Sequence, residues 1–448
     1  MKDLRTFIAL NRFGLGVAPG EAEKVEPDPQ GWIRRQIDRR QPVPAALESF
    51  PSAASIMKEI HGARIEGPES LARATREHYR KSFAPEIVAR ARNMIRTERP
   101  FAERMVLFWS NHFTVSRTKM IIGPALAAYE REAIRPHVFG RFEDMLLAVV
   151  GHVGMLSYLD NDLSMGPNSL VGRRARRSLN ENLAREILEL HTLGVNGGYA
   201  QADVTEFARA LTGWTHGGIV GRRMAVAVSG DFEFRRVMHE PGLKTILGRT
   251  YVEDGVDQAK AVLRDLAPHP STARFIATKL ARHFVADDPP ADAIEQVARV
   301  FRQTGGDLAE VSRALVDLDA VWREPLPKVK TPFELVISTL RAFDYDEPSP
   351  LTMRMPFDLM GQQPFNAPSP QGWSDQASHW IAPEALLRRI EWLRAIAARM
   401  PVGEKPAVLL DRLVGPVASA GLRQMVDLAP SADAAVAQIL ASAEFQRR

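Results

Sequence analysis

Apolar residues recur at every third or fourth position through most of this sequence, which is the spacing of one buried face on an α-helix. Between residues 100 and 118, Met105, Phe108, Trp109 and Phe113 fall on one such face. The same period predicts further helices over residues 32–38, 50–98, 124–151 with a break at Pro136, 180–193, 204–211, 259–266, 273–284, 291–303, 308–318, a helix that ends at 342, 383–399 and 405–448. The pattern therefore predicts a mainly α protein, built as a multi-helix orthogonal bundle.

One stretch departs from the helical period. Residues 217–252 contain three segments that alternate or are rich in β-forming residues: Met224–Val228, Phe232–Val237 and Thr245–Leu247. Ser229, Gly230 and Asp231 provide a turn between the first two segments. We therefore expect a small β-hairpin insertion in the helical fold.

The sequence shows no clear linker and no internal repeat across its 448 residues, so we expect it to fold as one unit. Within that unit the pattern changes several times along the chain. The regions are an N-terminal helical arm (1–99), a central helical core (100–216), the hairpin insertion (217–252), a helical part with a tryptophan-containing loop (253–400) and small C-terminal helices (401–448).

The segment 178–214 is predicted to form a helix, a tight turn and a second helix. Ser178 followed by Glu181 has the pattern of a capping box, and Gly194 can end the first helix. At about 100° per residue, four polar residues of that helix fall within one stripe: Asn182, Arg185, Glu186 and Glu189. The stripe fits a solvated face, and it also fits a polar site if other segments close over it.

Composition and charge exclude several classes of protein. The 58 lysines and arginines exceed the 54 acidic residues by only four, an excess too small to indicate nucleic-acid binding. The one dense basic run, residues 173–177, is expected in an exposed loop. The absence of cysteine excludes disulfides, thiolate metal sites and thiol catalysis. Without a secretory signal or a membrane span, we expect a cytoplasmic protein.

Two long motifs in the central segment make the chain recognisable. They are Asn180-Glu-Asn-Leu-Ala-Arg-Glu-Ile-Leu-Glu-Leu-His-Thr-Leu-Gly-Val-Asn-Gly-Gly-Tyr199 and Asp203-Val-Thr-Glu-Phe-Ala-Arg-Ala-Leu-Thr-Gly-Trp214. They resemble the bacterial domain-of-unknown-function 1800 family, and the resemblance extends over essentially the whole chain. It implies no particular activity. Many relatives are exported and encoded beside a twin-arginine-exported, sulfatase-like protein, so the resemblance implies such a partner and co-export with it.

The chain departs from the family pattern at three places. Glu240 replaces the usual aspartate in His239-Glu-Pro-Gly-Leu-Lys244, which lengthens the carboxylate's reach by one methylene. Ala200 replaces a threonine or serine N-cap, at a cost of about 1 kcal/mol. Gln376-Ala377 replaces two glycines before the last tryptophan of the 345–382 loop, so the backbone of that loop is expected to differ.

No P-loop, dinucleotide fingerprint, G-x-S-x-G or H-E-x-x-H motif is present. The remaining candidates for chemistry come from separate blocks of the chain. The candidate catalytic residues are Arg185, Glu186, Glu189 and Lys244, and the candidate substrate-binding residues are Asn180, Asn182, Trp373 and Trp380. The candidate ligands of a divalent metal ion are His112, Glu186, Glu189, His191 and His239.

Three kinds of function fit these residues. The first is a metal-dependent, hydrolase-type enzyme on the 180–193 helix. The second is a metal-free enzyme that acts on a glycan, with a carboxylate pair and tryptophan platforms. In the third, the polar stripe is a structural network, with Arg185 neutralising Glu189, and the protein is a binding or maturation partner.

Several of these residues also have a purely structural interpretation. His112 shares the apolar face of its helix, so it is either a core histidine or an imidazole aimed into an interior site. Trp373 and Trp380 can stack on a sugar or anchor their loop. His283, near a helix C-terminus, is expected to complement the helix dipole.

Overall fold

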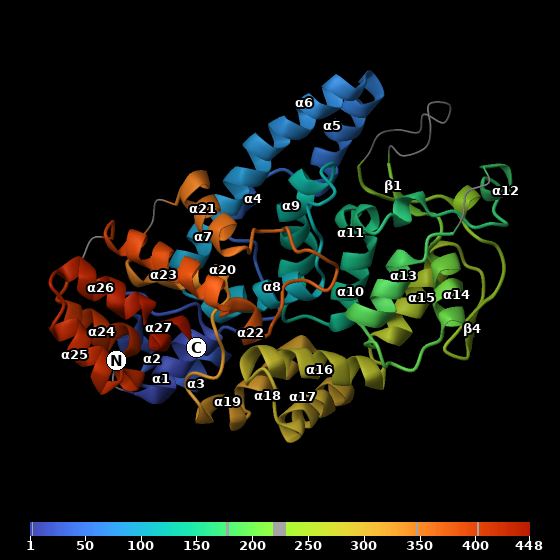
Figure 1. Ribbon diagram of the computed structural model, residues 1–448. Helices are drawn as coiled ribbons and strands as arrows, with labels where there is room; N and C mark the ends of the chain where they lie inside the picture. The colour runs from blue at the N-terminus through green and yellow to red at the C-terminus, as the bar shows by residue number, and fades with distance from the viewer. Residues whose placement is uncertain (2, 176–178, 218–229, 346–347, 401–402) are drawn as a thin grey trace.

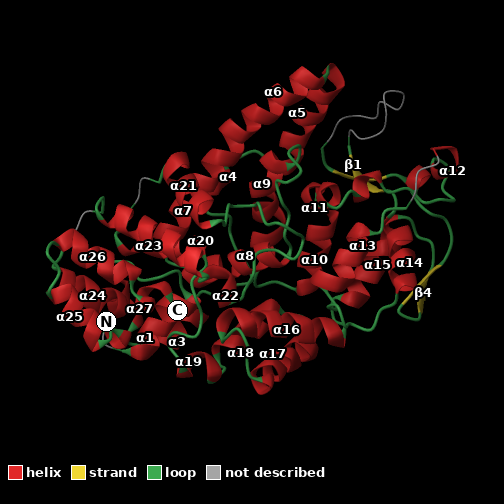
Figure 2. Cartoon of the chain, in the orientation of Figure 1, coloured by secondary structure: helices red, strands yellow, loops and turns green. Residues whose placement is uncertain are grey.

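Helices dominate the computed structural model of this chain, which describes residues 1, 3–175, 179–217, 230–345, 348–400 and 403–448 (Figures 1 and 2). The mainly α fold with a small β insertion is therefore confirmed. Three sequence-based expectations lie outside the described residues. They are the strand Met224–Val228, the capping role of Ser178 and the Arg176-Arg177 part of the basic run.

The N-terminal region combines core helices with a projecting helical hairpin. Its α-helices are α1 (Leu4–Ile8), α2 (Glu21–Val25), α3 (Pro29–Arg34), α4 (Ala45–Glu48), α5 (Ala53–Glu66), α6 (Pro68–His78) and α7 (Ala84–Arg96). Helices α5 and α6 pack against each other and project from the rest of the molecule (Figure 1). The predicted arm of residues 1–99 is therefore confined to these two helices, because Phe7, Leu10 and Phe13 are completely buried in the core.

The central region supplies the helices around which the others pack. They are α8 (Pro100–His112), α9 (Leu126–Tyr129), α10 (Phe142–Gly151), α11 (Val153–Tyr158), α12 (Gly172–Ala175), α13 (Asn182–Glu186) and α14 (Gln201–Leu211). Four π-helical turns extend helices of the first two regions: η1 (Ala9–Phe13), η2 (Tyr79–Phe83), η4 (Glu130–Ile134) and η7 (Ile187–His191). Short 3-10 turns are η3 (Gly123–Ala125), η5 (Arg135–His137), η6 (Asn161–Leu163), η8 (Arg236–Met238) and η9 (Gly415–Val417).

Among its described residues, the β insertion contains two short antiparallel strand pairs. Strand β1 (Trp214–His216) pairs with β2 (Phe232–Phe234), and β3 (Lys244–Ile246) pairs with β4 (Arg249–Tyr251). Strand β1 begins before the predicted boundary at 217, and all three of its residues are buried. The first strand of the insertion is therefore part of the core.

Helices joined by loops make up the described residues of the C-terminal half. Its helices are α15 (Val256–Leu266), α16 (Pro270–Phe284), α17 (Ala291–Thr304), α18 (Leu308–Val316), α19 (Ala320–Arg323), α20 (Pro332–Ala342), α21 (Pro350–Met360), α22 (Ala377–Trp380), α23 (Pro383–Ala397), α24 (Pro406–Val414), α25 (Ala420–Asp427), α26 (Ala432–Ala441) and α27 (Ala443–Gln446). The predicted ranges agree closely for α16, α17, α18 and α23, each of which has a clear apolar stripe or cap.

One set of buried hydrophobic side chains runs from Phe7 to Phe445, so distant parts of the sequence share a core. The end of the chain is tied to a segment before α20, where Val329 and Arg447 form an antiparallel bridge. The N-terminal amino group donates to the Asp411 carbonyl at 3.2 Å. Among the described residues, no helix is both long and apolar enough to cross a membrane.

Candidate functional site

The predicted polar stripe runs from α13 into η7, and its Arg185 contacts neighbouring side chains where α13 meets α14. The Glu181 carboxylate accepts hydrogen bonds from Arg185 at 3.1 Å, Gln201 at 2.8 Å and Thr205 at 2.7 Å. The structural interpretation predicted that Arg185 neutralises Glu189. In the structure Arg185 pairs with Glu181 instead. Arg185 and Glu181 are partly exposed, and these contacts link α13 to α14.

The helix is also shorter than predicted. It begins at Asn182, whose N–H donates to the Asn180 side chain at 2.9 Å, and it changes to a π-turn at Ile187. The π-turn alters the helical spacing, so Leu188 and His191 are buried while Leu190 is half-exposed. The Asn180 amide donates to the Asp160 carbonyl at 3.1 Å, so the start of the 160–168 loop lies beside it.

Glu186 and Glu189 are both half-buried on this helix. Burial raises the pKa of Glu186, and the negative charge of Glu189 raises it further. Burial, together with the charge of Glu186, raises the pKa of Tyr158 to about 12. The two carboxylates therefore influence each other, as their spacing of three residues suggested.

His112 and His191 are brought together in the core. The Nε2 atom of His112 lies 3.1 Å from the His191 carbonyl oxygen, and the ring centroids are 6.1 Å apart. Burial lowers the pKa of His191 to about 3 and that of His112 well below its ordinary value. Both imidazoles are therefore neutral near pH 7.

The 239–244 motif holds two loops together. The His239 Nδ1 atom lies 2.8 Å from the Thr212 carbonyl oxygen, and the Lys244 ammonium donates to the carbonyls of Glu240 and Gly242 at 3.0 and 2.7 Å. The longer Glu240 side chain accepts two hydrogen bonds from Asn168. Among the described residues, no three histidine, aspartate or glutamate side chains are grouped to hold a metal ion, and the metal site stays a prediction.

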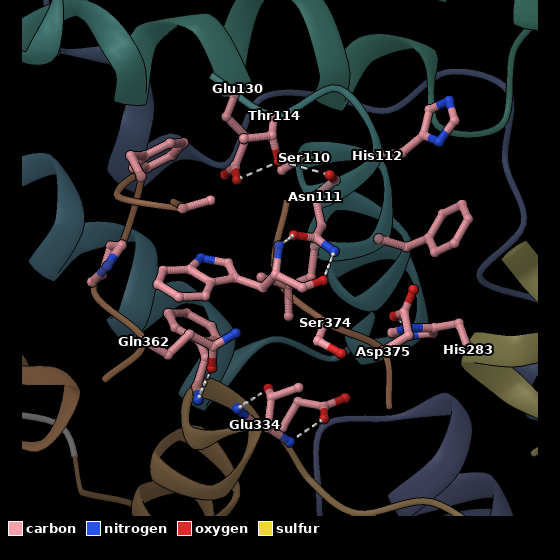
Figure 3. A pocket seen from close by; sticks show the side chains of 18 of the residues that line it. Ser110, Asn111, His112, Thr114, Glu130, His283, Glu334, Gln362, Ser374 and Asp375 are labelled. Atoms are coloured by element: carbon pink, nitrogen blue, oxygen red, sulfur yellow. Dashed lines mark hydrogen bonds and ion pairs between the residues drawn. The ribbon is translucent and has the colours of Figure 1, made fainter. Parts of the chain in front are cut away.

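A cavity of about 120 Å³ lies where α8, α16, α20 and the loop 361–375 meet (Figure 3). We call it the Lys279 cavity. Of the residues predicted for function, His112 and Trp373 line it. Its charged and polar lining consists of Arg90, Ser110, Asn111, His112, Thr114, Glu130, Lys279, His283, Thr331, Glu334, Gln362, Gln363, Ser374 and Asp375.

Three of these side chains, all charged or titratable, are not all paired with one another. Lys279 and His283 lie one turn apart on α16, and Asp375 comes from the loop. The His283 Nδ1 atom lies 3.6 Å from the Asp375 carboxylate, while its Nε2 atom is buried with no hydrogen-bond partner among the described residues. Lys279 makes no ion pair or hydrogen bond within the described part of the chain, and its ammonium lies 6.0 Å from the Phe275 ring.

Burial sets the protonation of this group. It lowers the pKa of His283 to about 4, with the positive charge of Arg448 acting in the same direction. Burial also lowers the pKa of Lys279 from its ordinary value. Burial alone would raise the pKa of Asp375, but His283, Lys279 and Lys328 reverse the shift and lower it. Near pH 7 the imidazole is therefore neutral and the carboxylate charged.

The other two carboxylates of the cavity are fully paired. Glu130 receives two hydrogen bonds from Arg90, at 2.6 and 2.7 Å, and one from Ser110 at 2.8 Å. Glu334 is bound by Arg104, and the Nε atom of Arg448 lies 2.9 Å from its carboxylate. These buried pairs are complete, so they brace the walls and leave Lys279 as the charge without a partner.

The loop that closes the cavity is fixed to α8 by its backbone. The Asn111 amide accepts from the Trp373 N–H at 2.7 Å and donates to the Trp373 carbonyl at 3.0 Å (Figure 3). Gly372 has φ +83°, and a Cβ atom there would lie 2.5 Å from the Asn111 carbonyl oxygen. Trp380 is buried and donates its indole N–H to Ser374, so it anchors the loop.

Sequence reasoning missed Lys279 and Asp375 and assigned His283 to the helix dipole. A usable signal was present on α16, where Phe275, Lys279 and His283 recur every four residues on one face. A cation on the same side as an aromatic residue indicates a helix face that other segments cover. The partner segment lies about 90 residues further on, and no local pattern connects the two.

The fold and cavity define a helical protein with a small, charged interior site. The chain belongs to the family described as "protein of unknown function (DUF1800)", whose model matches residues 8–447. The resemblance seen in the sequence is thereby confirmed. Neither a search of curated proteins nor one of solved structures found a match. The expectation of a sulfatase-like partner stays a prediction.

Proposed function

We propose that this protein is a hydrolase-type enzyme whose active site is the Lys279 cavity. The observation that carries the proposal is an ammonium without a partner beside a carboxylate–imidazole pair in one cavity. A half-buried cation that no carboxylate contacts directly is costly unless a ligand supplies a counter-charge at its ammonium. The proposed substrate therefore carries a small anionic or strongly polarised group that lies against Lys279.

His283 is the proposed general base. Its imidazole is neutral near pH 7, and Asp375 can accept from Nδ1, which leaves Nε2 to take a proton from water. The proton transfer would place positive charge on the imidazole, which the adjacent carboxylate stabilises, and the imidazolium would return the proton to the leaving group as its bond to the substrate breaks. Lys279 would stabilise the negative charge that develops as water attacks the substrate.

The size of the cavity limits the reacting group. Its volume of about 120 Å³ is close to the roughly 150 Å³ of a cavity that holds one benzene molecule. A larger substrate would therefore place only one end inside. The half-buried Trp373 lines the same cavity and offers an aromatic surface to the part of the substrate beside it.

The test is hydrolysis of four p-nitrophenyl esters, the acetate, butyrate, phosphate and sulfate, by the full chain. We expect cleavage of at least one, with His283→Gln losing about 10²- to 10⁴-fold in kcat. Glu189→Gln is the control and should keep full activity. The rate should rise with pH through the His283 pKa near 4 and fall again when Lys279 loses its proton. Equal activity in His283→Gln, or no cleavage of any ester, contradicts the proposal.

A further inference from the structure

A second cavity, of about 490 Å³, lies between η2, α7 and α21. We call it the Tyr79 cavity. Apolar side chains form most of its wall: Tyr79, Phe83, Ile87, Val88, Met353 and Phe357. Its volume falls within the roughly 300–1,000 Å³ that small-molecule sites occupy. It adjoins the Lys279 cavity, since Gln363 and Pro364 line both.

The charges at this cavity are not balanced. Arg354 and Asp358 pair with each other at 2.9 Å, so they contribute no net charge. Arg117 donates to the neutral Gln363 side chain and pairs with no carboxylate among the described residues. The half-buried guanidinium of Arg117 is therefore the excess charge of an otherwise apolar wall.

The backbone joins Arg117 to the loop beside it. The Arg117 N–H donates to the Phe365 carbonyl at 2.8 Å, and Phe365 itself has φ +52°, a conformation that a side chain of its size rarely adopts. Strained backbone of this kind persists where the surroundings hold it and is frequent at ligand sites. The guanidinium is thus presented to the cavity on a fixed frame.

We propose that the Tyr79 cavity binds a molecule with a single alkyl or acyl chain and an anionic end. The chain would lie along Phe83, Val88 and Phe357, and the anion would bind Arg117. The apolar wall favours an alkyl or acyl chain in the ligand. The excess positive charge favours a carboxylate over an amine at its end. This site goes beyond the proposed active site, because the two cavities share only Gln363 and Pro364 among their lining residues.

The experiment is calorimetric titration of the full chain with decanoate and with decyltrimethylammonium, both below their micelle concentrations. The full chain should bind decanoate and not the cation of equal chain length. Across octanoate, nonanoate and decanoate, affinity should rise about fourfold per methylene, since each buried CH₂ contributes ~0.8 kcal/mol. Failure to bind decanoate, or equal binding of the cation, overturns the proposal.

Two variants separate the parts of the site. Arg117→Gln keeps a donor toward Gln363 but removes the charge, and decanoate affinity should fall at least tenfold. Val88→Glu places a carboxylate on the apolar wall and should abolish binding, whereas Val408→Glu, at an exposed position on α24, should not change it. Unfolding in urea confirms that each variant is folded. Unchanged affinity in both cavity variants overturns the proposal, and Lys279→Met, which changes only the first cavity, should bind decanoate normally.

Discussion

The α13 stripe and the Lys279 cavity contain the same kinds of side chain, but they differ in whether each charged group has an ion-pair or hydrogen-bond partner. At the start of α13, Glu181 has Arg185, Gln201 and Thr205 as partners, and the group is partly exposed. In the cavity, Lys279 has no ion-pair or hydrogen-bond partner among the described residues, although α8, α16, α20 and the loop 361–375 enclose it. The difference teaches that an unmet charge inside a cavity is a stronger sign of function than a row of charges on a helix.

The largest expected effect comes from breaking a complete pair that braces the cavity. Glu334→Gln leaves Arg104 and Arg448 buried without their counter-charge, so the free energy of unfolding should fall by about 3–5 kcal/mol. Urea unfolding near pH 7 measures the loss. A change below about 1 kcal/mol would show that the cluster is not structural.

The pH dependence of the unfolding free energy tests the same role of Glu334. The charges of Arg448 and Arg104 outweigh burial and hold the pKa of Glu334 well below its ordinary range. Glu334 therefore contributes stability above the ordinary carboxyl pKa, and this contribution is lost as pH falls toward the depressed value. The difference in unfolding free energy between the native chain and Glu334→Gln should shrink below about pH 4. A constant difference would contradict this assignment.

The next effect concerns the loop that closes the cavity. Gly372→Ala should destabilise the protein by about 1–3 kcal/mol and speed hydrogen exchange over residues 361–377, because its φ is +83° and its Cβ would meet Asn111. Gly361→Ala is the matched control, since its φ is +77° but no atom lies within 4 Å of its Cβ. Equal costs in the two variants would mean that the contact with α8 is unimportant.

A smaller effect, of opposite sign, is expected at Lys279. Lys279→Met removes a half-buried charge without a partner, so stability should stay the same or rise by up to about 1 kcal/mol. Because its folded pKa is lowered, the native chain gains stability as pH rises from that pKa toward the unfolded value near 10.4. This rise should be absent in Lys279→Met. A loss of more than 1 kcal/mol would make Lys279 structural.

The smallest effect is expected on α13. Glu189→Gln should change the unfolding free energy by less than about 0.5 kcal/mol, since Arg185 pairs with Glu181 instead. The melting temperature and ester hydrolysis measure it. Loss of hydrolysis with an unchanged melting temperature would restore the α13 stripe as the site.

Helix periodicity predicted much of this architecture. The faces of α14 and α17 follow directly from their apolar spacing, and Gly194 has the positive φ expected after the first central helix. The shortened α13 could not be predicted, because the π-turn at Ile187 depends on tertiary packing. Of the candidate site, His112 and Trp373 were found from sequence, yet their meeting with Lys279 depends on contacts between segments far apart in the chain.

Equilibrium binding of a small anion tests the central claim most directly. Calorimetric titration of the full chain with inorganic phosphate and with acetate should show one site for at least one of them. Lys279→Met should abolish that binding, while Lys119→Met, which removes a lysine already paired with Asp160, should preserve it. Binding that survives Lys279→Met, or no binding of either anion, would contradict the assignment of the Lys279 cavity as the functional site.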